Sequence, residues 1–354
     1  MPTRTGRALL AVAAAGLILA QREVGAQNLA FSLFERYLEP LRVQAAIPGL
    51  SVVIVQNGQI VWERGLGYRD VEAFLPAMPD TPYPIADLTS TLTAALMGRC
   101  IDQGKLDLDV PIGTWAPTSD SPGLTLRQVV KHAAPGTLNG FKYDPTRFAL
   151  LARPVEACME VAFRKAIARE LLDRFMKADS VPGYDIASVP VELRSLFDDA
   201  TQAHYASVLS RMAVPYKLAK NGKPARSEMP PAVVDGSHGI ISSVRGLAAF
   251  DAALDSYAIV SPKLLTEAWT TSSHNGVATP FGMGWFVQTY QGEKLVWQFG
   301  NSPDAFSSLI LKVPSRRLTL ILLANSDGLS APFSLSDGDV TSSLFARTFL
   351  RLFL

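Results

Sequence analysis

The side chains best suited to catalysis or metal binding are few in this chain, and their spacing argues against two kinds of site. The four histidines show no His-x-x-x-His spacing of the kind that holds a metal on one helix: His132, His204, His238 and His274. The two cysteines cannot form a zinc cage by themselves. The sequence also names no acidic partner for any histidine. We therefore predict no metal, no other cofactor and no Ser-His-Asp triad.

The two cysteines, Cys100 and Cys158, leave two interpretations open. In an exported protein they are free to form a disulfide, provided that the fold brings their Cα atoms close enough. Two separate buried thiols agree equally well with the sequence.

Residues 1–26 have the features of a secretion signal. Arg4 and Arg7 make the start basic, Ala8 to Ala20 is an uncharged run of 13 residues, and Val24-Gly25-Ala26 is a small-residue cleavage site. An uncleaved N-terminal anchor is the alternative, but 13 apolar residues are too few to span a bilayer. We expect export to the periplasm or the medium, and no stable membrane span once the signal is removed.

The composition is that of a globular protein. The chain has 354 residues, of which 48% are hydrophobic, and its 33 basic and 32 acidic residues leave a net charge of +1. It has no Lys/Arg cluster of the kind that grips nucleic acid. The expected partner is a small-molecule or peptide-like ligand, and the oligomeric state cannot be predicted.

Both ends of the chain predict β-strands that would position a site. Gly49 to Val55 and Ile60 to Arg64 are β-rich runs, and the Asn-Gly between them is a strong hairpin signal. Near the other end Trp285 to Tyr290, Ser307 to Val313 and Leu318 to Ala324 read as strands. We predict one antiparallel sheet closed by distant parts of the chain.

The middle of the chain is predicted to be helical. Helical patterns cover Leu88 to Gln103, Pro154 to Asp179 and Val244 to Ser256, and a terminal amphipathic helix covers Phe345 to Leu354. Residues 178–240 read as a long, partly structured connection that walls a cleft. The domain from 27 to 354 is thus expected to have a sheet part (27–80 and about 235–354) and a mostly helical insertion (about 81–234).

From about residue 40 to 354 the chain resembles the serine β-lactamase and DD-peptidase-like hydrolases, especially the class C β-lactamase and esterase branch. The resemblance rests on short segments in a shared order: Ile47-Pro48-Gly49-Leu50-Ser51-Val52-Val53, Gly65-Leu66-Gly67-Tyr68, Tyr83-Pro84-Ile85-Ala86, Gly104-Lys105-Leu106-Asp107-Leu108-Asp109, Leu124 to His132, Gly282-Met283-Gly284-Trp285 and Leu323 to Gly328. It implies an α/β (α+β) fold of the β-lactamase/transpeptidase type. Such a fold has an antiparallel sheet flanked by terminal helices, and an all-helical subdomain.

The family's first site is Ser-x-x-Lys at the start of a helix, where the Lys amine takes the proton of the attacking Ser. The resemblance places Asp87 at the Ser position and Ser90 at the Lys position, and no Ser-x-x-Lys occurs anywhere in the chain. Asp87 is either an alternative nucleophile or base, or a helix N-cap, and we favour the N-cap. Ser90 is expected to be inert, because no base is apparent beside it.

A further consequence concerns the oxyanion hole that the resemblance implies. Backbone N–H groups near residues 87 and 301 would form it, and the negative Asp87 would occupy it. That carboxylate would also repel an anionic substrate. Both effects indicate loss of acyl transfer.

The family's other two sites are also altered. Tyr143 matches the Tyr of a Tyr-x-Asn loop, but Pro145 stands at the Asn position and lacks an amide. A cation at Lys142 or Arg147 would lower the pKa of Tyr143 if it were close. Gln298 and Gly300 match the ends of a Lys/His-x-Gly strand segment, followed by Asn301, so the cation is replaced by a neutral amide.

Three functions remain open on the sequence. The favoured one is an exported homologue of the serine hydrolases that is catalytically impaired and has a binding or regulatory role in the cell envelope. The second is an active esterase, amidase or β-lactam hydrolase that uses Tyr143, Ser90 or Asp87 in a non-family arrangement. The third is a structural or interaction module with a filled cleft.

Overall fold

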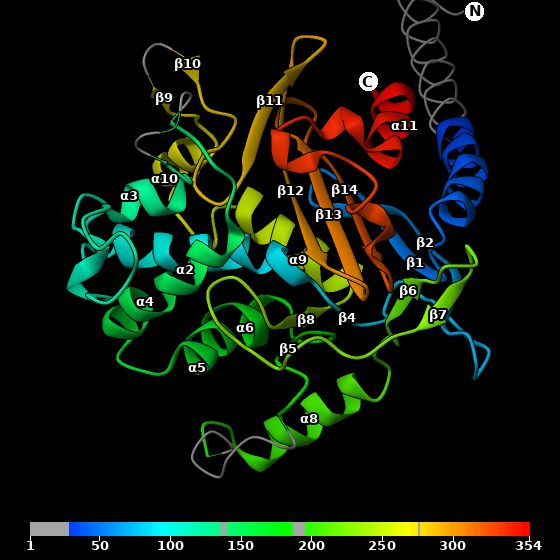
Figure 1. Ribbon diagram of the computed structural model, residues 1–354, viewed down its shortest axis with the longest axis horizontal. Coiled ribbons are helices and arrows are strands. Elements are labelled where there is room, and N and C mark those ends of the chain that lie inside the picture. The colour runs from blue at the N-terminus through cyan, green and yellow to red at the C-terminus, as the bar shows by residue number, and fades with distance from the viewer. Residues whose placement is uncertain (1–27, 135–136, 138–139, 187–194, 275–276) are drawn as a thin grey trace, which may run out of the picture.

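A seven-stranded antiparallel sheet forms the centre of the fold, in the order β11-β12-β13-β14-β1-β2-β3 (Figure 1). The computed structural model describes residues 28–134, 137, 140–186, 195–274 and 277–354, so the predicted signal at 1–26 lies outside the described residues. The strands of the sheet are β1 (Gly49–Gln56), β2 (Gln59–Asp70), β3 (Leu75–Pro76), β11 (Phe286–Tyr290), β12 (Glu293–Ser302), β13 (Phe306–Val313) and β14 (Leu318–Ala324).

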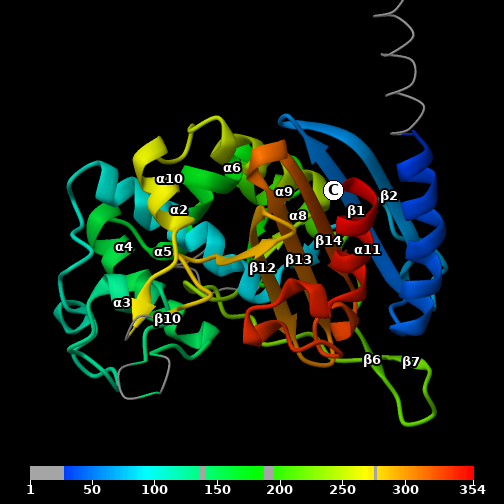
Figure 2. The ribbon, with the colours of Figure 1, turned by 90° about the horizontal axis from the view of Figure 1, so that it is seen from above.

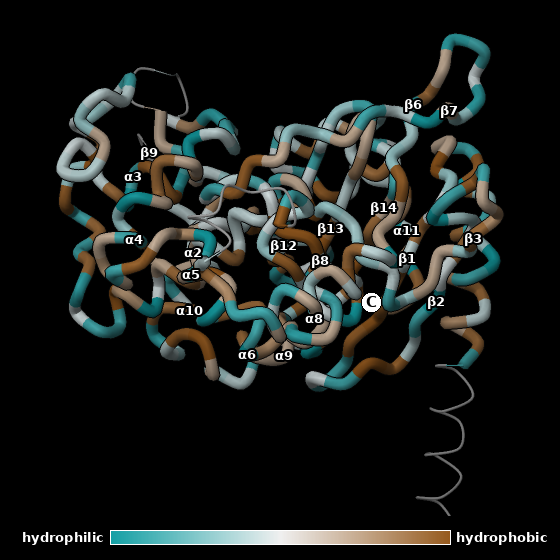
Figure 3. The backbone as a smooth tube through the Cα atoms, turned by 90° about the horizontal axis from the view of Figure 1, so that it is seen from below, coloured by the Kyte–Doolittle hydropathy of each residue, from teal (hydrophilic) through white to brown (hydrophobic). Residues whose placement is uncertain are grey.

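The sheet is closed by the two ends of the chain, as predicted. Strand β1 pairs with β14, with Val53 opposite Ile321. The hairpin between β1 and β2 turns at Asn57 and Gly58, whose φ angles of 54° and 74° suit a tight Asn-Gly turn. The central strands β1, β13 and β14 carry near-continuous hydrophobic runs because both of their faces are covered (Figure 3).

Helices cover both faces of the sheet (Figure 2). On one side α9 (Val244–Asp255) packs against β1 and β14. On the other side α11 (Leu344–Phe353) lies beside the helix formed by residues 28–44, and the Phe34 ring contacts the rings of Trp62 in β2 and Phe349 in α11. The terminal amphipathic helix is therefore a packing element of the core.

Most of the remaining helices gather on the side of the sheet where β11 and β12 lie, whereas α8 lies apart from them, near β5 (Figure 1). Their bounds are α2 (Thr89–Asp102), α3 (Leu126–Val130), α4 (Ala152–Met159), α5 (Phe163–Ile167), α6 (Asp173–Phe175), α8 (Asp199–Leu209) and α10 (Pro262–Ala268). The predicted helical segment Pro154 to Asp179 is divided among α4, α5 and α6. The first break follows Glu160, whose left-handed φ of 57° ends α4.

Short strands outside the central sheet form three small sheets within the connecting segments that the structure describes. Strand β8 (Ile240–Ser242) lies between β4 (Tyr83–Pro84) and β5 (Val181–Pro182). Two further pairs form hairpins: β6 (Tyr216–Leu218) with β7 (Pro224–Arg226), and β9 (Ser273–His274) with β10 (Val277–Ala278). The β4-β8-β5 sheet places the two ends of the long connection, at Val181–Pro182 and Ile240, beside the segment that leads into α2. The boundaries suggested at residues 80 and 235 stay a prediction.

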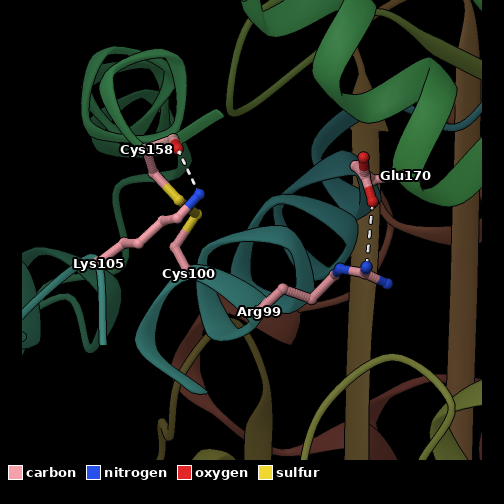
Figure 4. Close-up of a disulfide and its surroundings, with 5 residues drawn as sticks. All are labelled: Arg99, Cys100, Lys105, Cys158 and Glu170. Atoms are coloured by element: carbon pink, nitrogen blue, oxygen red, sulfur yellow. Dashed lines mark hydrogen bonds and ion pairs between the residues drawn. A yellow bond between two sulfur atoms is a disulfide. The ribbon is translucent and has the colours of Figure 1, made fainter. Parts of the chain in front are cut away.

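A disulfide between Cys100 and Cys158 joins α2 to α4, with the two Cα atoms 6.2 Å apart (Figure 4). The alternative of two separate thiols is therefore wrong. Nearby, Lys105 Nζ donates to the Cys158 carbonyl at 3.4 Å, and Arg99 pairs with Glu170 at 3.0 Å. These contacts fix the far end of α2, and the candidate site lies at its other end.

Candidate active site

The turn that leads into α2 depends on a residue with a left-handed φ angle and on a glycine in a neighbouring strand. Asp87 lies in the 3-10 turn η1 (Ala86–Leu88), and the preceding Ala86 has a left-handed φ of 51°, which is costly for a residue with a Cβ. Strand β12 passes close to this turn at Gly300. A Cβ there would overlap the Ile85 carbonyl oxygen and Ser308 Oγ. Only glycine lets the strand lie against η1.

The buried Asp87 carboxylate, 4% exposed, is held by two donors from other segments. The backbone N–H of Asn301 donates to its Oδ2 at 3.1 Å, and His238 Nε2 lies 2.8 Å from its Oδ1. The N-cap prediction for Asp87 is wrong, because the N-cap residue of α2 is Leu88 and no side chain caps that helix. The carboxylate instead takes the N–H of Asn301, the position at which the resemblance puts an oxyanion donor.

His238 is the site residue that sequence reasoning missed. It lies 151 positions from Asp87 in the chain, and neither its spacing nor its neighbours signal a partner. Its other ring nitrogen, Nδ1, lies 2.6 Å from Ser237 Oγ, and that hydroxyl lies 2.8 Å from Asp235 Oδ1. A hydrogen-bonded row therefore runs from Asp87 through His238 and Ser237 to Asp235.

The two carboxylates at the ends of this row determine which atoms carry its protons. If the single hydroxyl proton of Ser237 is given to Asp235, Nδ1 of His238 must donate to Ser237, and Nε2 donates to Asp87. The imidazole then carries both protons and a positive charge. Consistent with this, the hydrogen bond to Asp87 raises the pKa of His238 above its usual value, against the opposing effect of burial.

A second row joins the other predicted residues. The Tyr143 hydroxyl donates to Gln298 Oε1 at 3.4 Å, and Gln298 Nε2 donates to Ser90 Oγ at 3.3 Å. Burial and the negative Asp87 raise the pKa of Tyr143 well above its usual value, so the idea that Lys142 or Arg147 lowers it is wrong. The Tyr143 hydroxyl therefore stays protonated at neutral pH and does not act as a base.

Two other predicted residues have structural positions. Pro145 opens the turn η3 (Pro145–Leu151) and does not line the cavity described next. His132 is buried, and its Nδ1 accepts from the backbone N–H of Asp144 at 3.3 Å. Burial lowers the pKa of His132 to about 3, so the ring is neutral and holds the Tyr143 loop.

A cavity of about 370 Å³ opens beside His238, and its size is that of a small-ligand site. The connection 178–240 supplies much of its wall, as the sequence suggested. The lining residues are Pro84, Ala86, Gly183, Tyr184, Pro230, Pro231, Ala232, Val233, Asp235, His238, Gly239, Ile241, Asn301, Ser302 and Pro303. Its walls are mainly proline and aliphatic groups, with the Asp87–His238 pair at one side.

The described residues contain neither a metal-binding cluster nor a helix that could cross a membrane. Within residues 28–134, 137, 140–186, 195–274 and 277–354, no cluster of three His, Cys, Asp or Glu side chains is arranged to hold a metal ion. Over the same ranges no helix combines the length and apolar character needed to cross a membrane.

Comparisons with known proteins agree with this geometry. The family model described as Beta-lactamase matches residues 34–337. A 102-residue stretch, 27% of the chain, is 31% identical to the human serine beta-lactamase-like protein LACTB, mitochondrial, and a 71-residue stretch, 20% of the chain, is 35% identical to the Staphylococcus aureus protein flp. These matches span only 19% and 14% of those relatives' lengths.

Solved structures show the same fold at low identity. The octameric penicillin-binding protein homologue from Pyrococcus abyssi superposes with a TM-score of 0.69 at 21% identity, over 84% of this chain and 74% of that one. The D-alanine carboxypeptidase AmpC from Burkholderia cenocepacia superposes with a TM-score of 0.67 at 18% identity, over 92% of this chain and 99% of that one. The predicted fold class is confirmed.

Proposed function

This chain belongs to the beta-lactamase family, and from that premise we propose that it binds a ligand in the family's cleft without forming an acyl-enzyme there. The observation that carries the proposal is the position of Asp87. Its carboxylate stands where the resemblance puts a nucleophilic hydroxyl, and it accepts the Asn301 N–H that would stabilise an oxyanion. The Asp87 carboxylate thus occupies the position in which the negative oxygen of an acyl-transfer transition state would be bound.

No group beside Asp87 replaces the missing chemistry. An acyl carbonyl attacked by a carboxylate would give a mixed anhydride, and both oxygens of Asp87 are already engaged by donors. Ser90 has Gln298 beside it, and an amide does not accept a proton at neutral pH. Tyr143 is held protonated. Ser90, Gln298 and Tyr143 therefore supply neither an activated nucleophile nor a base.

The cavity supports binding over the filled-cleft alternative. A space of about 370 Å³ is left open beside the Asp87–His238 pair. Export and a binding or regulatory role in the cell envelope are part of the proposal. The Cys100–Cys158 disulfide supports export, because disulfides persist in oxidising compartments.

A second candidate function rests on Ser237. Its hydroxyl, His238 and Asp87 form a hydrogen-bonded series of the residue types used by serine hydrolases. Three observations weigh against Ser237 as a nucleophile. Its side chain is only 1% exposed, its Oγ also lies 2.8 Å from Asp235 Oδ1, and it does not line the cavity. An esterase that uses Ser237 is therefore the alternative that the experiment must detect.

The test is residue-level mapping of covalent adducts. The protein without residues 1–26 is incubated with benzylpenicillin and with p-nitrophenyl acetate, and adducts are located by peptide mass spectrometry. A heat-unfolded sample gives the background on surface lysines. We expect no folded-state adduct at Asp87, Ser90, Tyr143 or Ser237, and the same p-nitrophenolate release from the natural protein, Asp87→Asn and Ser237→Ala.

Two results would overturn the proposal. A folded-state adduct on one of those four residues would identify a working nucleophile. Ester turnover that Asp87→Asn abolishes and Ser237→Ala leaves intact would do the same. It would also reveal an acyl-aspartate too short-lived for mass spectrometry. Turnover that Ser237→Ala abolishes, with a mapped adduct there, would establish the esterase alternative.

A further inference from the structure

We infer that the cavity beside His238 selects an uncharged, largely apolar ligand with a carbonyl group, and discriminates against carboxylates. This inference extends the proposed function. It rests on that function only in assuming that the cleft binds a ligand. The inference starts from the wall, where Pro230, Pro231, Pro303, Val233 and Ile241 present apolar surface. Such a wall gains free energy from apolar groups of the ligand as they leave water.

The charges around the cavity disfavour an anion. None of the described residues that line it is Lys or Arg, while Asp235 lines it and Asp87 lies behind His238. Arg164, close to Gly183, is held in a two-pronged pair with Asp185 at 2.9 and 3.1 Å. Even with a positive His238, the two aspartates leave a net negative charge beside the ligand. An anionic ligand would lose its hydration and meet repulsion there.

The polar groups of the wall are largely occupied. Both ring nitrogens of His238 are engaged, and Asp235 Oδ1 accepts from the backbone N–H groups of Ser237 and His238 and from the Ser237 hydroxyl. The Tyr184 hydroxyl donates to the Pro230 carbonyl. A ligand therefore finds few unsatisfied partners on these side chains, which suits an apolar body.

The side chain of Asn301 offers an amide N–H donor, and we assign it the polar contact with the ligand. Its Oδ1 accepts from Ser330 Oγ at 3.0 Å, and its backbone N–H is given to Asp87. Within the part of the chain that the structure describes, its amide Nδ2 donates to no acceptor. Asn301 lines the cavity, and we therefore infer that this amide donates to a carbonyl oxygen of the ligand.

The test is a matched ligand series that differs in one group: 4-phenylbutanamide, 4-phenylbutanoate and 4-phenylbutylamine. None carries a leaving group, so the series cannot report acylation and its failure is separate from that of the adduct experiment. Affinities are measured at pH 6 by ligand-observed NMR. We expect the amide to bind and the carboxylate to bind at least about tenfold more weakly, which is about 1.4 kcal/mol. The amine lacks a carbonyl, and its charge must leave water to enter the apolar wall, so it should also bind more weakly than the amide in spite of the net negative charge.

Variants assign the effect to the cavity. Asn301→Asp replaces the free N–H donor and keeps Oδ1 for Ser330, so amide affinity should fall about fivefold, as for one lost hydrogen bond. Ala232→Trp places a large side chain from an exposed position into the cavity and should abolish binding. Asn221→Asp makes the same charge change away from the cavity and should leave affinity unchanged.

The outcomes are distinct. Tighter binding of the carboxylate or of the amine than of the amide would overturn the inferred ligand class. No binding of the amide at low-millimolar concentration would overturn it too. Amide binding that survives Ala232→Trp, in protein with a native melting curve, would place the ligand elsewhere and contradict the site.

Discussion

At the scale of single residues, Asp87 and His238 act as one unit. Asp87 alone, buried within the turn η1, would be an uncompensated charge, and such charges are costly. His238 Nε2 at 2.8 Å and the Asn301 N–H at 3.1 Å compensate it. The carboxylate at the oxyanion position is thereby paired with His238 and hydrogen-bonded to Asn301, so it needs no ligand to satisfy it.

The first prediction is that Asp87→Asn lowers the pKa of His238. The raised pKa of His238 comes chiefly from its hydrogen bond with Asp87, so a neutral amide removes that cause and leaves the opposing effect of burial. The measurement is an NMR titration of the His238 ring protons in both proteins. Ser315→Ala, at an exposed position away from this pair, is the control. An unchanged His238 pKa in Asp87→Asn would contradict the assigned pair.

The second prediction concerns acid sensitivity through His132. Its folded pKa of about 3 lies below the unfolded value of about 6.5, so the stability that its neutral form contributes is complete above pH 6.5. That contribution is lost as the pH falls from 6.5 toward 3. Between pH 6 and 4 the natural protein should lose up to about 1.4 kcal/mol per pH unit more than His132→Asn.

Asparagine suits that position for two reasons. It tolerates the left-handed φ of 51° at His132, and its side-chain oxygen can accept the Asp144 N–H. Urea unfolding at several pH values gives the free energies of unfolding, and the titration of the carboxylates affects both proteins equally. Parallel pH profiles for the two proteins would show that His132 does not titrate on unfolding.

At the scale of elements, the site depends on strand β12 lying against the turn η1. This closeness explains how a strand near the C-terminus and a turn near residue 87 share a carboxylate. Gly300 is the position that permits it, since a Cβ would overlap the Ile85 carbonyl and Ser308 Oγ.

The third prediction is that Gly300→Ala is destabilising. Forcing the strand from the turn should lower the free energy of unfolding by about 1–3 kcal/mol, as overpacking does. It should also disturb the NMR signal of the Asn301 amide, which donates to Asp87. Gly123→Ala is the matched control, because a Cβ there has open space and Gly123 has no left-handed φ. Equal stabilities of the two variants would contradict the close approach.

The fourth prediction concerns the link between α2 and α4. The Cys100–Cys158 disulfide closes 58 residues of chain, so replacing both cysteines with alanine should lower the free energy of unfolding by roughly 2–4 kcal/mol. Urea unfolding of the oxidised protein and of the double variant measures the difference. A difference below about 0.5 kcal/mol, the range of ordinary surface substitutions, would argue against the link.

At the scale of the whole molecule, what could be read from the sequence depended on local signals. The β1–β2 hairpin follows from Asn57-Gly58, and β14 follows from the apolar run Leu318 to Ala324. The family resemblance then located Asp87 and Gly300. The break at Glu160 was not visible, because one left-handed residue leaves the helical periodicity on both sides intact.

The site's chemistry was less predictable than its position. Asp87 was interpreted as a cap because Asp at a helix start usually is one, and here tertiary contacts override that preference. His238 went unnoticed because its partner comes from a segment 151 residues away, brought close only by the β4–β8 pairing. Contacts across the fold leave no periodic trace in a sequence.

The central claim, that Asp87 has replaced the nucleophile in an otherwise preserved cleft, is tested most directly by adduct mapping on Asp87→Ser/Ser90→Lys beside the natural protein. With p-nitrophenyl acetate we predict a folded-state acyl adduct at position 87 only in the double variant, because the Asn301 N–H is then free for an oxyanion. Benzylpenicillin should react less, since Pro145 and Gln298 lack the family's ligand groups. An adduct or catalytic turnover on the natural protein, or no adduct on a correctly folded double variant, would contradict the account.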